Sequence, residues 1–174
     1  MKFKIFIIAL FMCLFQFNNA QNSSLLNFGI NTDFITIPLT ENSILSNNTV
    51  VNIGYNLNDN LNCKIGYEGS VIKENKENKY TNLSGLVVGF GYYLNNNKKN
   101  EFNTELFASY TNAFNNFSSF DNYHSDLGIK FYYKKLFYIG TAVRYSNNNL
   151  TLSTNRNNLN WYWQMGIQLP VFKK

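Results

Sequence analysis

The sequence predicts an all-β protein in which eight antiparallel strands run up and down and close into one transmembrane β-barrel. Three observations predict this fold. Apolar and polar residues alternate with period two along eight segments, as in strands with two different faces. No segment after residue 20 has helical periodicity, and none is apolar over the ~18 residues that a membrane helix needs. Aromatic residues make up 17% of the chain, and they favour strands.

The first 20 residues are expected to be a cleaved signal peptide. Lys2 and Lys4 precede an apolar run over residues 5–17, and Ala20 is a small residue at the expected cleavage site. This run is shorter than the ~20 residues of a spanning helix, which argues against a membrane anchor. The expected organisation is therefore a signal peptide, residues 1–20, and one exported β-barrel domain, residues 21–174.

The composition argues against a nucleic-acid partner, an internal disulfide and a metal site. The net charge of +5 falls to +3 when Lys2 and Lys4 leave with the signal, which is too mild to indicate a nucleic-acid partner. Cys13 would leave with them, so Cys63 stands alone and no internal disulfide is expected. One histidine and one cysteine supply no metal-ligand cluster. We expect no cofactor and no metal site.

The last segment, residues 159–171, shows the alternation most clearly. Every odd position is apolar, whereas the even positions from 160 to 168 are polar, aromatic or glycine, as in Asn160, Gln164 and Gly166. The same pattern extends over seven earlier segments, which are residues 26–34, 51–57, 61–68, 85–94, 102–110, 126–133 and 137–145. A slip of one residue would turn every side chain to the wrong face, so the pattern also predicts the register of each strand.

All charges within these strands share one face with most of the glycines. The charged residues are Asp33, Lys64, Glu68, Glu105, Asp126, Lys130 and Arg144. An eight-stranded barrel has room inside only for side chains, and glycines would make space for the charged ones. The uncharged, aromatic-rich face is then the lipid face, because a soluble protein with so much exposed apolar surface would aggregate. We therefore predict a charge network in the barrel interior.

The strand order suggests partners within this network. A short connection at Lys134-Lys135 would bring Asp126 close to Arg144, and the fifth and sixth strands would bring Glu105 near Lys130. One interpretation is a switchable salt bridge that gates a thin ion path. The simpler interpretation is a plug that satisfies buried charges and fills the barrel.

The connections between strands alternate in length. Residues 58–60, 95–100 and 134–135 are predicted as short or polar turns, and residues 37–48, 73–81, 112–122 and 147–158 as longer loops. In transmembrane barrels the short turns are periplasmic and the longer loops lie outside. Aromatic residues near the strand ends predict two girdles, one at the periplasmic interface (Tyr55, Tyr92, Tyr133, Phe137) and one at the outer interface (Tyr110, Tyr123, Tyr145, Trp161).

With these strands in place, the mature chain resembles the small outer-membrane β-barrel family of Gram-negative bacteria. The last strand resembles the family's C-terminal assembly signal through Gln164, Gly166, Leu169, Val171 and the aromatic Phe172, although two lysines follow it and Pro170 implies a strand end or bulge. The resemblance implies export to the outer membrane, contact with outer-membrane lipid and lipopolysaccharide, and recognition by the assembly machinery. We expect a monomer.

The family resemblance implies a range of functions rather than one. We expect a structural or cell-surface interaction role, with a narrow ion-conducting pore as the alternative and a lipid-modifying enzyme as the second alternative. His124 and Ser125 are adjacent in a strand, so their side chains point to opposite faces and cannot form a nucleophile–base pair. His124 is predicted to be an ordinary interfacial residue, and we expect no enzymatic activity.

Overall fold

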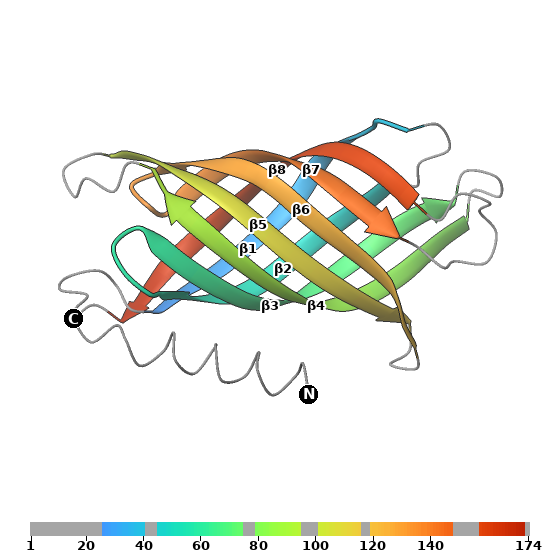
Figure 1. The fold of residues 1–174 in the computed structure, drawn as a ribbon, viewed down its shortest axis with the longest axis horizontal. Helices are drawn as coiled ribbons and strands as arrows, with labels where there is room; N and C mark the ends of the chain where they lie inside the picture. The colour runs from blue at the N-terminus through green and yellow to red at the C-terminus, as the bar shows by residue number, and fades with distance from the viewer. Residues whose placement is uncertain are drawn as a thin grey trace, which may run out of the picture.

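The computed structural model describes residues 26–40, 45–74, 79–94, 101–115, 119–147 and 157–172. The expected signal peptide lies outside these ranges. Eight strands follow one another around the molecule (Figure 1). They are β1 (Leu26–Pro38), β2 (Leu45–Asn56), β3 (Leu61–Glu74), β4 (Lys79–Tyr93), β5 (Phe102–Asn115), β6 (Ser119–Tyr133), β7 (Phe137–Asn147) and β8 (Asn157–Phe172).

The strands form one closed barrel in which each pairs with its neighbours in the chain and β8 returns to β1. Every pairing is antiparallel, so the predicted all-β, eight-stranded, up-and-down barrel is confirmed. Leu26 of β1 lies opposite Phe172 of β8 at one end of the barrel, which we call the terminal end. At the other end, which we call the loop end, β1, β3, β5 and β7 end and β2, β4, β6 and β8 begin. In the described part of the chain, no helix is long and apolar enough to cross a membrane.

The strands extend further toward the loop end than the sequence predicts. β2 begins at Leu45, β3 continues to Glu74, and β5 continues to Asn115. The connections after β1, β3 and β5 are correspondingly shorter than predicted, whereas the one after β7 begins close to its predicted position. In a closed barrel every strand has a hydrogen-bonding partner on both sides, so the ladder continues into polar sequence where the apolar alternation has ended.

Two irregularities interrupt the pairing of β1 with β8. Asp33 lies opposite Gln164 and Ile35 opposite Trp163, so Phe34 is an extra residue, and both Phe34 and Ile35 are exposed. Near the terminal end, Leu26 lies opposite Phe172 and Asn27 opposite Pro170. The bulge expected near Pro170 is therefore confirmed, and it accommodates a residue that has no N–H to donate to the ladder.

The burial of this barrel is reversed relative to a soluble protein. Most of the buried side chains are polar or charged, with Glu68, Glu105 and Arg144 no more than 3% exposed. Large apolar side chains point outward, and Ile65 and Leu127 are 62% and 70% exposed. The buried hydrophobic groups are chiefly aromatic, and they form two small clusters, Tyr93–Tyr132–Tyr138 and Phe107–Ala142–Tyr162.

Candidate functional site

The interior of the barrel brings together all seven charged residues that the sequence places on the inner face. Six of them are buried, and the side chain of Lys64 is 12% exposed. Together with His124, Tyr132 and Gln168, these charged residues form two groups along the barrel axis. The loop-end cluster contains Asp33, Glu68, His124, Asp126 and Arg144, and the terminal-end cluster contains Lys64, Glu105, Lys130, Tyr132 and Gln168.

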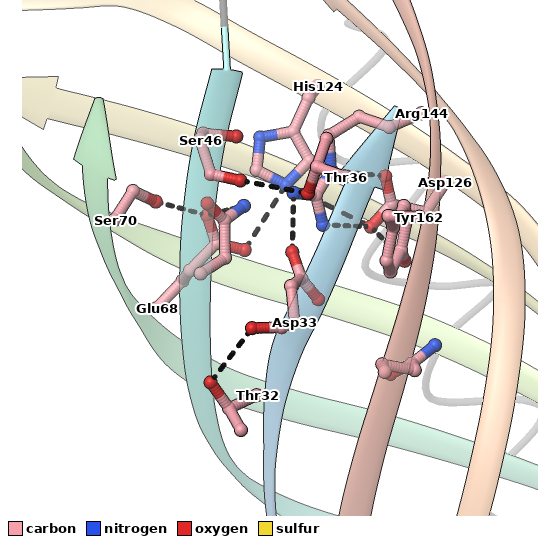
Figure 2. Close-up of polar contacts among 12 residues, drawn as sticks. Thr32, Asp33, Thr36, Ser46, Glu68, Ser70, His124, Asp126, Arg144 and Tyr162 are labelled. Atoms are coloured by element: carbon pink, nitrogen blue, oxygen red, sulfur yellow. Dashed lines mark hydrogen bonds and ion pairs between the residues drawn. The ribbon is translucent and has the colours of Figure 1, made fainter. Parts of the chain in front are cut away.

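Arg144 is the centre of the loop-end cluster (Figure 2). Its Nε and Nη2 donate to the two carboxylate oxygens of Asp126 at 2.8 and 2.9 Å, and its Nη1 donates to Asp33 Oδ2 at 2.8 Å. Tyr162 donates its hydroxyl to Asp126 and also lies under the guanidinium, 4.3 Å from ring centroid to Cζ. A planar guanidinium can bind two carboxylates in this way, and the three charges cross the interior from β7 to β6 and β1.

Glu68 is held by donors from four strands. Asn48 Nδ2 and Ser70 Oγ donate to Oε1 at 3.0 and 2.6 Å, and Thr111 Oγ1 donates to Oε2 at 3.3 Å. His124 Nε2 lies 3.1 Å from Oε2, as Figure 2 shows. A buried carboxylate requires such partners, because an unsatisfied one would be very costly.

His124 therefore corrects one prediction. It is not an interfacial residue, because its side chain is buried inside the barrel, and its Nε2 lies 4.0 Å from Asp126 Oδ2 as well as against Glu68. The signal was present in the sequence: position 124 has the same parity as the inward positions Asp126 and Lys130. The strand was predicted to begin only at 126, so the alternation was not extended back to 124.

The terminal-end cluster is organised around Glu105. Lys64 Nζ donates to Oε1 at 2.7 Å and Asn62 Nδ2 donates to the same atom at 3.1 Å. Tyr132 donates its hydroxyl to Oε2 and lies within 3.0 Å of Gln168 Oε1. Two strands other than its own, β3 and β6, thus contribute to the binding of this one carboxylate.

The predicted neighbour of Glu105 is confirmed, but the ion pair of Glu105 is with a different residue. Lys130 is its register partner on β6, but the ion pair of Glu105 is with Lys64 on β3, two strands away in the other direction. The reason is Gly91 on β4: a Cβ at that position would overlap Glu105 Oε1 and lie 2.7 Å from Asn62 Nδ2. The missing side chain lets the carboxylate lean across β4, whereas Lys130 Nζ lies over the Phe107 ring, 4.2 Å from its centroid.

A cavity of about 50 Å³ lies between the two clusters. Lys64, Lys130, Glu68, Arg144 and Gln164 are among the residues that line it. The cavity has room for a few water molecules, since a single water molecule needs a cavity volume of ~10–15 Å³. Among the described residues, no group of three or more His, Cys, Asp or Glu side chains could hold a metal ion.

The aromatic residues predicted as girdles point away from the interior. Six of the eight are exposed, and Tyr55 and Tyr123 are half-buried. Phe102 and Tyr133 contact each other near the terminal end, with ring centroids 5.3 Å apart, and Tyr110 and Tyr123 stack toward the loop end at 6.0 Å. Trp161 is anchored on the outer face because its indole N–H donates to Thr141 Oγ1.

The five residues of the predicted assembly signal lie in β8, from its middle to its last residue. Gln164 is buried inside the barrel, and its side-chain oxygen accepts from Asn31 Nδ2 at 3.2 Å. Gly166 leaves the space that the Tyr138 ring occupies. Leu169 and Val171 are about half exposed on the outer face. Phe172 is the last residue of the strand.

Comparison with known proteins identifies barrels but no family. No family model and no curated protein matches this chain. Among solved structures, the chain is similar to the N-terminal β-barrel domain of OprF from Pseudomonas aeruginosa, with 13% identity, a TM-score of 0.47, and 86% of this chain and 100% of that chain covered. It is also similar to a de novo designed transmembrane β-barrel, with 15% identity, a TM-score of 0.47, and 86% and 98% covered.

Proposed function

We propose that this chain is an outer-membrane protein whose barrel spans the lipid with a filled interior and serves a structural or cell-surface interaction role. The observation that carries the proposal is the reversed burial: charges are inside, and large apolar side chains are outside. Every outward side chain of the described strands whose burial is known is uncharged. In water such a surface would drive aggregation, whereas in a bilayer it matches the hydrocarbon.

The length of the outward apolar face supports the same proposal. In β7 it runs from Phe137 to Tyr145, and in β8 from Leu159 to Val171. A tilted membrane strand needs ~9–11 residues to cross the hydrocarbon. The antiparallel closed barrel with an even number of strands is the architecture of bacterial outer membranes, which is why we propose that membrane rather than the inner one.

The interior favours a structural role over transport. Arg144 links Asp126 and Asp33 across the barrel, and Glu68 is bound from four strands. Moving any of these groups aside would leave a buried charge without its partner, which costs several kcal/mol. A stable plug is therefore the state that the side chains favour.

The experiment for the membrane assignment is heat-modifiability. The mature protein, which should begin at Gln21, is isolated from an outer-membrane fraction and run on a detergent gel with and without boiling. A change of mobility on boiling is the expected result, because a closed barrel resists the detergent until it is heated. Recovery from the soluble periplasmic fraction, with no change of mobility, would overturn the proposal.

A narrow pore is the second candidate, and the cavity lined by charged residues between the two clusters is the observation that favours it. Conductance across a planar bilayer distinguishes a narrow pore from a structural barrel with a filled interior. The structural proposal expects no current steps above those of the lipid alone. Discrete steps from the wild type that change in Arg144→Ala would favour the pore instead.

We propose no catalytic role for His124. Its Nε2 lies against the carboxylates of Glu68 and Asp126 in the interior, whereas lipid chains would contact the outer face. The neighbouring Ser125 lies on the opposite side of the strand. A lipase or acyltransferase assay on the wild type and on His124→Ala tests the point: an activity that the substitution abolishes would establish the enzyme instead.

A further inference from the structure

Lys130 is a buried lysine that forms no ion pair with any residue in the described part of the chain. Its Nζ lies over two aromatic rings of the interior, 4.2 Å from the centroid of Phe107 and 4.9 Å from that of Tyr138. The faces of these rings attract the ammonium group, but they offer its N–H groups no oxygen or nitrogen acceptor. A buried charge with unused donors is costly, so a further partner would stabilise it.

A second unused donor belongs to Gln164, which is also buried. Its Oε1 accepts from Asn31 Nδ2 at 3.2 Å, whereas its Nε2 has no hydrogen-bond partner among the described residues. Gly140 on β7 separates the two residues, because it lies in register with Lys130 on β6 and with Gln164 on β8. A Cβ on Gly140 would lie 2.9 Å from Lys130 Cγ and 3.4 Å from Gln164 Cγ. Both side chains therefore lean over the glycine, and its missing side chain brings them together.

Lys130 and Gln164 both line the cavity of about 50 Å³ between the two clusters, and Lys64 lines it as well. The terminal-end cluster contains two ammonium groups, those of Lys64 and Lys130, but only one carboxylate. That carboxylate belongs to Glu105, and Lys64 Nζ lies 2.7 Å from its Oε1. One positive charge of this cluster is therefore left without a carboxylate, and it lies at the wall of a cavity.

Two carboxylates, those of Glu68 and Asp126, also line the cavity, and both are already bound. Each oxygen of Glu68 accepts hydrogen bonds from its own donors, and each oxygen of Asp126 accepts one from Arg144 (Figure 2). The carboxylates of the cavity wall are thus occupied, whereas the donors of Lys130 and Gln164 are not. A cavity with unused donors and occupied acceptors favours an anion over a cation.

We propose that this cavity binds one small monovalent anion of the size of chloride, held by the Lys130 ammonium and the Gln164 side-chain amide. The space suffices, because a chloride ion is only slightly larger than a water molecule and the cavity has room for a few of those. A sulfate or phosphate ion fits less well, since its greater charge would be repelled by Glu68 and Asp126. The anion would neutralise the terminal-end cluster and complete the filling of the interior. The proposal concerns the inside of the barrel and does not depend on what surrounds the outer face.

The first test compares urea unfolding of the mature protein, in detergent micelles, in potassium chloride and in potassium gluconate. Equal ionic strength keeps the screening of charges the same in both salts, and gluconate is too large for the cavity. An anion that binds only the folded barrel stabilises it by mass action. At a chloride concentration ten times the dissociation constant, the unfolding equilibrium constant should therefore be roughly tenfold lower than in gluconate.

The variant Lys130→Met assigns the effect to the cavity, because it keeps a long side chain against the aromatic rings but removes the ammonium group. It should unfold equally in chloride and in gluconate. The matched control is Lys134→Met, which removes the same charge from the exposed turn between β6 and β7 and should respond to chloride like the wild type. Crystals grown in sodium bromide provide a second measurement. An anomalous bromide peak is expected in the cavity, next to Lys130 Nζ and Gln164 Nε2.

Two results would overturn the inference. Equal unfolding of the wild type in the two salts, with no bromide peak in the cavity, would mean that no halide binds there. A chloride effect that persists in Lys130→Met would assign the anion to another part of the molecule. The gel-mobility assay reports whether each variant has closed into a barrel, and Gln164→Leu, which should also lose the chloride effect, replaces Lys130→Met if that variant does not fold.

Discussion

Arg144 and Asp126 face each other in register across β6 and β7, and their side chains form a bidentate pair inside the barrel. The two hydrogen bonds measure 2.8 and 2.9 Å, and both residues are nearly inaccessible to solvent. The third nitrogen of the guanidinium reaches Asp33 on β1. One cation thus binds two carboxylates, Asp126 on the adjacent strand β6 and Asp33 on β1, which lies beyond β8.

Replacement of this arginine should destabilise the barrel strongly. In Arg144→Ala, Asp126 and Asp33 would stay buried without their cation, and the loss of one partner of a buried pair costs about 3–5 kcal/mol. Urea unfolding in lipid vesicles, followed by gel mobility, measures the change. Arg144→Lys is the matched control and should lose less, because it keeps the charge but not the fork of donors. An unfolding free energy unchanged in Arg144→Ala would show that the pair is not a stabilising element.

The space left by Gly91 should be essential to the terminal-end cluster. In Gly91→Ala the new methyl group would overlap the Glu105 carboxylate, so Glu105 would have to move away from Asn62 and Lys64. Overpacking of this kind costs about 1–3 kcal/mol, and weakening the ion pair adds to it. Unfolding in urea provides the measurement.

Gly69→Ala is the control for that substitution, because a Cβ at Gly69 meets no atom within 4 Å. The same change of residue on the same barrel should therefore alter the unfolding free energy by only a few tenths of a kcal/mol. Equal effects of the two substitutions would mean that Gly91 matters through backbone flexibility rather than through the space it leaves.

A charge on the outer face should distinguish a membrane barrel from a soluble one. Leu127 is 70% exposed near the middle of the outward face of β6. In a bilayer, Leu127→Lys should cost about 2–4 kcal/mol, which is the penalty for lysine near the midplane. In a soluble protein, a lysine at so exposed a position would change the stability by less than about 0.5 kcal/mol.

The matched control for this charge is Asp59→Lys, in the exposed turn between β2 and β3. It should refold into vesicles with the yield of the wild type. If Leu127→Lys also unfolds like the wild type, the outer face does not contact hydrocarbon.

Cys63 provides a chemical probe of the same face. It lies on an outward position of β3, half-buried, and its thiol donates to the carbonyl of Tyr55 at 3.6 Å. In a bilayer, a charged maleimide should label it slowly, because the reagent does not enter hydrocarbon and the reactive thiolate is disfavoured there. Labelling after boiling in detergent should be complete. Mass spectrometry measures the extent of labelling before and after boiling. Rapid labelling of the folded protein in vesicles would place Cys63 in water.

The sequence by itself determined which segments form strands and which face of each strand points inward. It also determined at which end of the barrel each pair of strands is connected. Period-two alternation is a local property, and a barrel with apolar lipid outside and packed side chains inside imposes it on every strand. The sequence also predicted that Asp126 would approach Arg144, because a short connection specifies the register of a hairpin. The strand ends were less accurate, since hydrogen bonding to two neighbours extends strands into polar sequence.

Only the tertiary structure decided which charges pair across the interior. Glu105 bonds to Lys64 rather than to its register partner Lys130, because Gly91 leaves a path for the carboxylate over β4. Asp33 reaches Arg144 although 111 residues separate them in the chain, because closure of β8 on β1 brings both to the same part of the interior. Long side chains in a narrow closed space choose partners by free volume and distance, and neither quantity can be read from the alternation of residues.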